Sequence, residues 1–325
     1  MNIAITNRCS RRCEFCFQKD WFLESPERKL EEMSPDMFRL VTMHMKSGGY
    51  SLLGGEPLMH SKIDEILDFC QNCNIGISML SNISVDHSLF SNIINKYSKI
   101  ISGWLINSDY PEEQRDLFMK NLVTLIDYQL SRKINFTLGT TLVPREGAID
   151  EAIERLSYIM KRVPKSVIPS LRLSATTPTH NKVFKMYDYT KDVEKLVLTL
   201  RKINEDLFFY FDCSPLGCMI SSDFTGQYID VIKRKPRICT NPIPDIMPDG
   251  RVYWCSSATF LTVPNVLDYN SEQELTEELQ RQWKEYWMTA SFSKKCRDCR
   301  ELKPGACYGY CAAVDYAIYH DHCEC

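Results

Sequence analysis

The sequence has no apolar run long enough to cross a membrane and no block of like charge. Its longest apolar stretches, such as Leu207–Phe211, are far shorter than the roughly 20 residues that a membrane-spanning helix needs. The N-terminus also lacks the charged start and the apolar run of a secretory signal. The formal net charge of −3 is close to neutral, so we expect neither nucleic acid nor a membrane as a main partner. These absences predict a cytoplasmic protein.

Cysteine is abundant, although it is missing from a long middle segment. The chain has fifteen cysteines, and none of them lies between residues 74 and 212. Ten lie from Cys213 to Cys325, two are Cys70 and Cys73, and three fall within residues 9–16. A reducing compartment disfavours disulfides, and an odd count does not fit a fully paired scaffold, so the clusters indicate metal binding or catalysis. Cys70 and Cys73 could be a redox pair, but we expect buried apolar thiols.

Short apolar runs alternate with amphipathic segments over the first two-thirds of the chain. The predicted strands are Asn2–Thr6, Tyr50–Leu53, Gly76–Leu80, Ile100–Ile106, Ile134–Leu142 and Ser170–Leu173. The predicted helices are Pro35–Lys46, Lys62–Cys73, Phe90–Lys96, Glu112–Gln129, Asp150–Arg162 and Asp192–Asn204. This alternation predicts an α/β fold with a parallel sheet. Six units are too few for the closed eight-unit barrel, so we predict a partial (β/α)6 TIM-like barrel.

The character of the sequence changes near residue 205. Prolines, cysteines and short turns dominate from there on, with one clear helix near Glu272–Trp287. We therefore predict a barrel domain at residues 1–205 and a small, loop-rich, cysteine-rich domain at residues 206–325.

Three cysteines follow the first predicted strand in the pattern Cys9-Ser-Arg-Arg-Cys13-Glu-Phe-Cys16. Three thiolates this close on one loop can hold three irons of a cubane cluster and leave the fourth iron open to a substrate or cofactor. A zinc site is the alternative, but structural zinc normally takes four ligands, and the loop offers no fourth.

A second motif, Gly54-Gly55-Glu56-Pro57, follows the second predicted strand. Two glycines allow a ligand to approach the backbone closely, and the neighbouring carboxylate can accept hydrogen bonds from an ammonium group. Alone it could be an ordinary Gly-Gly turn. Its place one β/α unit after the three-cysteine loop favours a binding role.

Together the two motifs resemble the radical S-adenosylmethionine (SAM) superfamily. The resemblance implies a [4Fe–4S] cluster on Cys9, Cys13 and Cys16 whose open iron binds SAM, and reductive cleavage of SAM to a 5′-deoxyadenosyl radical. It also implies that the Gly54–Pro57 motif contacts the methionine amine. Polar residues that end later strands would contact the rest of SAM: Ser81 near the adenosine, Asn107 near the ribose, and Arg172.

The later cysteines resemble the SPASM extension of radical SAM enzymes, except that the gap from Cys299 to Cys307 has seven residues where five are usual. That resemblance implies an iron–sulfur domain with two auxiliary [4Fe–4S] clusters. One would use Cys239, Cys255, Cys311 and either Cys213 or Cys218; the other would use Cys296, Cys299, Cys307 and either Cys323 or Cys325. Zinc knuckles are the alternative for these spacings.

SPASM-type relatives mostly modify peptides or proteins, so the resemblance implies a ribosomal-peptide maturase, an oxidoreductase that forms a crosslink or oxidises a residue. An electron donor such as flavodoxin or ferredoxin would serve it. Because the first predicted strand begins at residue 2, we expect substrate recognition by a separate partner protein or by the C-terminal region. Ser256 stands where sulfatase-maturing relatives carry an Asp base, which argues against that activity. The alternatives are a radical dehydrogenase or decarboxylase of a small molecule, and a non-catalytic metal-binding interaction protein.

Overall fold

The structure is a computed structural model of the 325-residue chain. It describes residues 1–16, 30–132, 135–176, 184–185, 187–212, 219–220, 222–228, 230–234, 243–289 and 323–324. The chain divides into two compact units, the first made of Met1–Phe136 with Asn241–Tyr286 and the second of Thr137–Thr240 with Trp287–Cys325.

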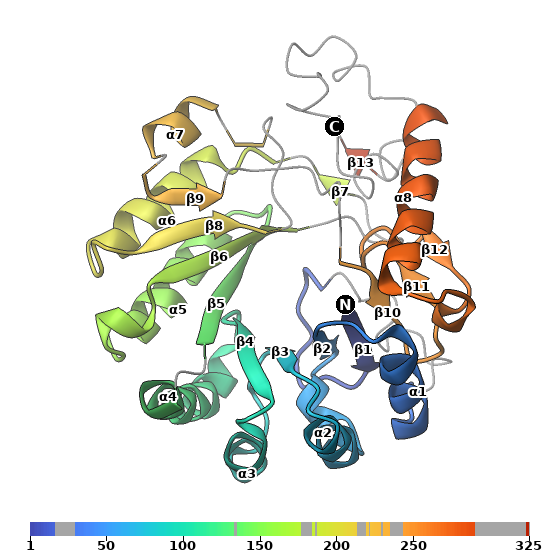
Figure 1. The fold of residues 1–325 in the computed structure, drawn as a ribbon. Helices are drawn as coiled ribbons and strands as arrows, with labels where there is room; N and C mark the ends of the chain where they lie inside the picture. Colours follow the sequence, from blue (N-terminus) through green and yellow to red (C-terminus); the bar gives the residue numbers. More distant parts are fainter. Residues whose placement is uncertain are drawn as a thin grey trace. The chain divides into compact units, whose positions relative to one another are not determined.

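The first unit contains a parallel sheet whose strands follow one another in sequence order, with helices between them (Figure 1). The strands are β1 (Asn2–Thr6), β2 (Tyr50–Gly54), β3 (Ile77–Ser81) and β4 (Ile101–Asn107). The helices are α1 (Pro35–Met45), α2 (Ile63–Asn72), α3 (His87–Tyr97) and α4 (Arg115–Arg132), with short 3₁₀ helices η1 (Pro57–Met59) and η2 (Glu112–Gln114). In parallel strands the carboxyl ends lie at one edge, so the loops after β1 to β4 meet there.

A segment from late in the chain extends this sheet beside its first strand. Strand β10 (Asp245–Ile246) pairs in parallel with β1, placing Asn2 opposite Asp245. Strands β11 (Val252–Tyr253) and β12 (Thr262–Val263) continue in antiparallel order, followed by η4 (Val266–Asp268) and helix α8 (Glu272–Thr289). Trp254 stacks on Trp283 of α8 with ring centroids 6.0 Å apart. The sequence predicts no strand at residues 245–246, so it does not predict this pairing with residue 2.

The second unit repeats the alternation of strands and helices. Its strands β5 (Asn135–Leu142), β6 (Ser170–Ala175), β8 (Phe208–Phe211) and β9 (Ile232–Arg234) are parallel neighbours in that order. Its helices are α5 (Ala148–Met160), η3 (Lys165–Val167), α6 (Thr190–Arg201) and α7 (Ser222–Gln227). Strands β7 (Phe184–Lys185) and β13 (Cys323–Glu324) form a separate parallel pair.

Local signals explain where the helices begin. The hydroxyl of Ser34 accepts a hydrogen bond from the amide of Met37, so Ser34 caps the N-terminus of α1. Helix α3 begins at His87, earlier than the predicted Phe90, because the carboxylate of Asp86 caps it. The buried faces of the strands form the core between sheet and helices, including the fully buried side chains of Ile3, Ile5, Leu52 and Met79.

The predicted α/β class with a mostly parallel sheet is confirmed, and the strand order is the one that consecutive units of a TIM-like barrel require. The division at residue 205 stays a prediction. Of the predicted cysteine-rich domain, most of the cysteines lie outside the described residues. No helix in the described part of the chain is both long and apolar enough to span a membrane.

Candidate functional site

The three-cysteine loop leaves the carboxyl end of β1 and lies partly exposed. The thiols of Cys9, Cys13 and Cys16 are not joined in disulfides. The amide of Cys16 donates to the carbonyl of Cys13 (3.2 Å), which turns the loop back on itself. The backbone amide of Arg11 donates to Cys9 Sγ (3.4 Å). The loop therefore offers three thiols within eight residues, one of them already accepting a hydrogen bond.

Burial favours the protonated form of two of these thiols. It raises the pKa of Cys9, and it raises the pKa of Cys13 to about 11. No three His, Cys, Asp or Glu side chains of the described residues are gathered as a ready-made metal cage. Binding of metal would have to displace thiol protons and draw the three sulfurs together, as is usual for thiolate sites.

The Gly54-Gly55 motif brings the end of β2 against the first turn of the cysteine loop. A Cβ on Gly54 would lie 2.3 Å from the carbonyl oxygen of Thr6, and one on Gly55 would lie 2.2 Å from that of Arg8. Gly54 also has a φ of +147°, which side-chain-bearing residues rarely adopt. In this structure the two glycines therefore allow the end of β2 to lie close to the backbone of Thr6 and Arg8.

Glu56 buries its carboxylate directly behind this contact. Its side chain is fully buried, and its amide donates to the carbonyl of Arg8 (2.8 Å). One oxygen, Oε1, accepts from the hydroxyl of Ser81 (2.7 Å) and from the amide of Leu58 (3.2 Å). The other, Oε2, accepts from the amide of Asn82 (2.7 Å). Burial raises the pKa of Glu56, partly offset by these hydrogen bonds.

Asn82 connects the two motifs. Its backbone amide binds Glu56, and its side-chain Nδ2 donates to Cys9 Sγ (3.6 Å). The orientation of the side chain is set because its Oδ1 accepts from the amide of Ser84 (2.8 Å). The next residue, Ile83, is fully buried with a φ of +48°, a strained conformation for a β-branched residue.

A buried asparagine on α4 holds this strained loop. Asn121 is fully buried, and its Nδ2 donates to the carbonyls of Ile83 (2.7 Å) and Val85 (2.9 Å). Its Oδ1 contacts Nδ1 of His87 (2.8 Å). All polar groups of the Asn121 side chain are therefore engaged, and they fix the loop that carries Asn82.

Arg11, between the first two cysteines, is the most connected side chain at the site. The residue is buried, with 7% of its surface exposed. Nη2 donates to the carbonyl of Asn82 (2.8 Å) and to Ser84 Oγ (2.7 Å). Nη1 donates to the carbonyl and Oδ1 of Asn107 (3.1 and 3.2 Å), and Nε donates to Gln114 Oε1 (3.3 Å). Arg11 thus ties the cysteine loop to the ends of β3 and β4.

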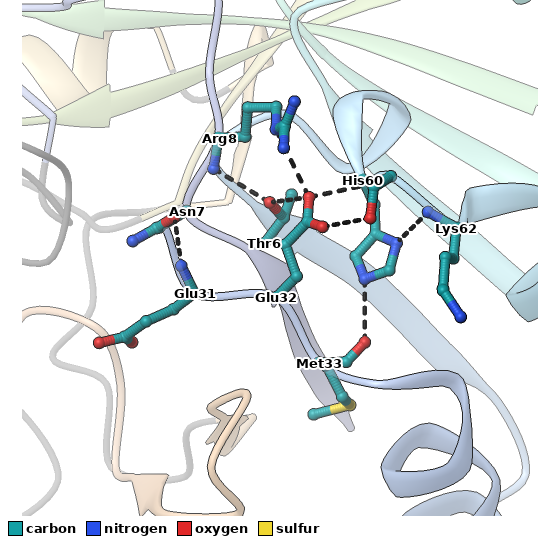
Figure 2. A network of polar contacts seen from close by, with 9 residues as sticks. Thr6, Asn7, Arg8, Glu31, Glu32, Met33, His60 and Lys62 are labelled. Atoms are coloured by element: carbon teal, nitrogen blue, oxygen red, sulfur yellow. Dashed lines mark hydrogen bonds and ion pairs between the residues drawn. The ribbon is translucent and has the colours of Figure 1, made fainter. Parts of the chain in front are cut away.

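A polar network fixes the chain just before Cys9 (Figure 2). The segment that leads into α1 forms a bridge with the end of β1, where Thr6 lies opposite Glu32. The Glu32 carboxylate accepts from Thr6 Oγ1 (3.2 Å) and forms an ion pair with Arg8 Nε (3.5 Å). His60 Nε2 donates to the carbonyl of Met33 (2.9 Å), because its Nδ1 accepts from the amide of Lys62. Burial lowers the pKa of His60, which keeps the ring neutral.

The remaining predicted SAM contacts have protein partners. Ser81 is buried and donates to Glu56, and Asn107 accepts from Arg11 and contacts Asp109. Arg172, in the second unit, forms a 2.6 Å ion pair with Asp212. Pro57 is the first residue of η1, where its missing amide proton costs nothing. Their contacts to SAM stay predictions.

The auxiliary-cluster assignments concern cysteines mostly outside the described residues, namely Cys213, Cys218, Cys239, Cys296, Cys299, Cys307, Cys311 and Cys325. Cys323 lies in β13, and its ligand role is untested. Cys255 is partly exposed beside Ser256, whose hydroxyl donates to the buried carboxylate of Asp245.

Of the two cysteines at the end of α2, only one is buried as predicted. Cys70 is buried, and burial raises its pKa to about 12, which makes it an inert thiol. Cys73 is exposed, contrary to the expectation of two buried thiols, because it caps the end of the helix.

Sequence reasoning missed Arg11 and Asn121. Arg11 stands next to an equally basic neighbour, Arg12, which is exposed, so residue type could not separate them. Position could not separate them either, because both lie between Cys9 and Cys13. Asn121 lies in the middle of a helix, where its interior position as a polar residue was a weak signal of a buried hydrogen-bonding role.

Comparisons with known proteins agree with this fold. Residues 3–88 match the family model described as the Radical SAM superfamily. The structure of Streptococcus suis SuiB bound to S-adenosylmethionine is similar over 96% of this chain and 72% of that chain, with a TM-score of 0.62 and 18% identity. SuiB bound to its precursor peptide SuiA matches over 96% and 71%, with a TM-score of 0.59 and 17% identity.

A third structure, native anSMEcpe with bound AdoMet, matches over 99% of this chain and 95% of that chain, with a TM-score of 0.58 and 14% identity. At these identities the likeness concerns the fold. No protein of curated function matches the chain at a significant level.

Proposed function

We propose that this chain, which carries a radical SAM domain, cleaves SAM to a 5′-deoxyadenosyl radical and uses it to modify a peptide or protein. The observation that carries the proposal is the bridge made by Asn82, which binds Glu56 through its amide and Cys9 through its side chain. Through it the cysteine loop and the glycine motif, separated by 37 residues in the sequence, form one site.

The donor set fits a [4Fe–4S] cluster with one open iron. Cys9, Cys13 and Cys16 would hold it, and when bound it would supply the single electron that breaks a carbon–sulfur bond of SAM. Two donors, the Arg11 amide and the Asn82 side-chain amide, point at Cys9 Sγ. Such hydrogen bonds favour a thiolate over a thiol.

The protein's own residues shape the place where SAM would bind. Glu56 accepts one hydrogen bond at Oε2, and a carboxylate oxygen can accept a second, so it retains capacity for the SAM ammonium group. The Gly55 amide donates to the carbonyl of Thr6 (2.7 Å), which fixes the backbone of the motif. Burial of this region excludes water from a reactive radical.

A peptide or protein substrate is supported by the fold likeness to SuiB, whose structure is recorded with a precursor peptide. The two auxiliary clusters, the leader-recognition partner and the flavodoxin or ferredoxin donor belong to the same proposal. Mass spectrometry of a candidate peptide after incubation with enzyme, SAM and reductant tests the substrate class. Modification of a small molecule in place of any peptide would overturn that part of the proposal.

The radical chemistry is tested by a triple variant in which Cys9, Cys13 and Cys16 are changed to Ala. We expect it to lose about four irons per chain and all 5′-deoxyadenosine formation. The exposed Cys73→Ala is the matched control, because it removes a thiol of the same unit with no predicted ligand role. It should keep the iron content and activity of the wild type. Cleavage of SAM by the triple variant would contradict the proposal.

A further inference from the structure

The charge of Arg11 has no direct ion-pair partner among the residues that the structure describes. All its hydrogen-bond acceptors are neutral: backbone carbonyls, a hydroxyl and two side-chain amides. Within the described residues no carboxylate forms an ion pair with it. The two carboxylates whose charges act on it, Glu56 and Asp109, do so through space and not through a hydrogen bond.

A buried arginine without an ion pair lowers the stability of the folded protein unless a negative charge binds beside it. A buried charge without a counter-ion loses its hydration, and neutral hydrogen bonds recover only part of that loss. Arg172, which is more exposed than Arg11, does have a direct carboxylate partner, because Asp212 lies 2.6 Å from it. The more deeply buried of these two arginines is the one that lacks an ion pair.

The negative charge that Arg11 lacks is the one that the cysteine loop would acquire. A cubane core with two positive charges, held by three thiolates, has a net charge of about −1, and one-electron reduction makes it about −2. Arg11 lies between two of the three cysteines in the sequence, and its amide donates to the sulfur of Cys9.

We propose that Arg11 is the counter-cation of the cluster held by Cys9, Cys13 and Cys16, and that it raises the cluster's reduction potential. The inference rests on the proposed function. Reduction adds one electron and breaks no bond, so a fixed positive charge nearby favours the reduced state directly. Arg11 also holds the carbonyl of Asn82, whose side chain donates to Cys9 Sγ. It is a positioning residue that acts through charge and through this hydrogen bond.

The test is a redox titration of holoenzyme variants, followed by electron paramagnetic resonance. The signal to follow is that of the cluster whose spectrum changes when SAM is added, which separates it from any other cluster. At the potential where half of this cluster is reduced in the wild type, Arg11→Gln should lower the reduced-to-oxidised ratio at least tenfold. This corresponds to a fall of about 59 mV for a one-electron couple. Arg11→Lys, which keeps the charge, should stay within threefold of the wild type.

Arg12→Gln is the matched control, because it removes the same charge one residue away from an exposed side chain. It should leave the ratio unchanged, since an exposed charge is screened by water and salt. If Arg11→Gln binds no iron, Gln114→Glu replaces it: this change places a carboxylate against Arg11 Nε, now 3.3 Å from Gln114 Oε1. It neutralises the guanidinium without removing it, and should lower the ratio at least threefold.

The outcomes separate the two claims. If the wild-type protein gives no cluster signal that responds to SAM, the proposed function is wrong, and the inference about Arg11 is wrong with it. A wild type with that signal, together with fully loaded Arg11→Gln or Gln114→Glu at the wild-type ratio, overturns the role of Arg11 alone. An equal fall in Arg11→Gln and Arg12→Gln, or in Arg11→Gln and Arg11→Lys, also overturns it, because the effect would then not depend on the buried charge.

Discussion

Replacing Gly55 by Ala should destabilise the protein even without iron or SAM. The added Cβ would lie 2.2 Å from the Arg8 carbonyl oxygen and 3.0 Å from the Cβ of Cys9. The nearest obstacle is backbone, which cannot rotate away as a side chain can. Relief requires the end of β2 and the cysteine loop to separate by about 1 Å, the difference from an ordinary carbon–oxygen contact. That movement stretches the hydrogen bonds of the Gly55 and Glu56 amides to Thr6 and Arg8.

The magnitude follows from these losses. Two hydrogen bonds contribute about 1 kcal/mol each, and residual overpacking costs about 1–3 kcal/mol, so Gly55→Ala should lower the free energy of unfolding by about 3–5 kcal/mol. This is a large share of the total for a natural domain, typically about 5–15 kcal/mol. Gly54→Ala should be similar, because it combines a 2.3 Å contact with a φ of +147°.

The assay is thermal and urea unfolding of the iron-free protein, with proteolysis as a second readout. Gly76→Ala is the control, because a Cβ there would meet nothing within 4 Å; it should leave the unfolding midpoint nearly unchanged. If Gly55→Ala unfolds at the wild-type midpoint but loses SAM affinity, the reasoning is wrong. The glycines would then serve the approach of a ligand and not the packing of the chain.

Two further changes test the support around the site. Asn121→Ala removes the hydrogen bonds to Ile83, Val85 and His87 and should cost about 2–4 kcal/mol of unfolding free energy; a cost no larger than that of Thr124→Ala, at a partly exposed position of the same helix, would refute it. Burial lowers the pKa of His60 in the folded protein, so between the folded and the unfolded pKa the unfolded chain binds more protons. The stability of the folded protein that depends on neutral His60 is therefore complete above about pH 6.5 and is lost as the pH falls toward the folded pKa. The melting temperature should therefore fall more between pH 7.5 and 5.5 in the wild type than in His60→Gln, and equal slopes would contradict this.

The cysteine loop and the glycine motif were both found in the sequence, because each is a local pattern of residues with distinctive chemistry. How the motifs meet was not. The bridge through Asn82 depends on β2 lying between β1 and β3 in the sheet, and Ser81 and Asn107 turned out to bind Glu56 and Arg11, respectively. Strand ends predict which residues gather at an edge, but which partner each side chain takes depends on ångström-scale geometry.

The sequence by itself determined the order and type of β1 to β6, of α1 to α6 and of α8, and it located the cysteine loop after β1. Apolar periodicity and caps act over a few residues, so they can be read along the chain. The tertiary structure alone decided that β10 pairs with β1, with Asn2 opposite Asp245, and that Arg11 is buried while Arg12 is exposed. Both outcomes depend on contacts between residues far apart in sequence. Whether each arginine is buried depends on the space and the hydrogen-bond acceptors that other strands provide, and no local sequence pattern encodes these.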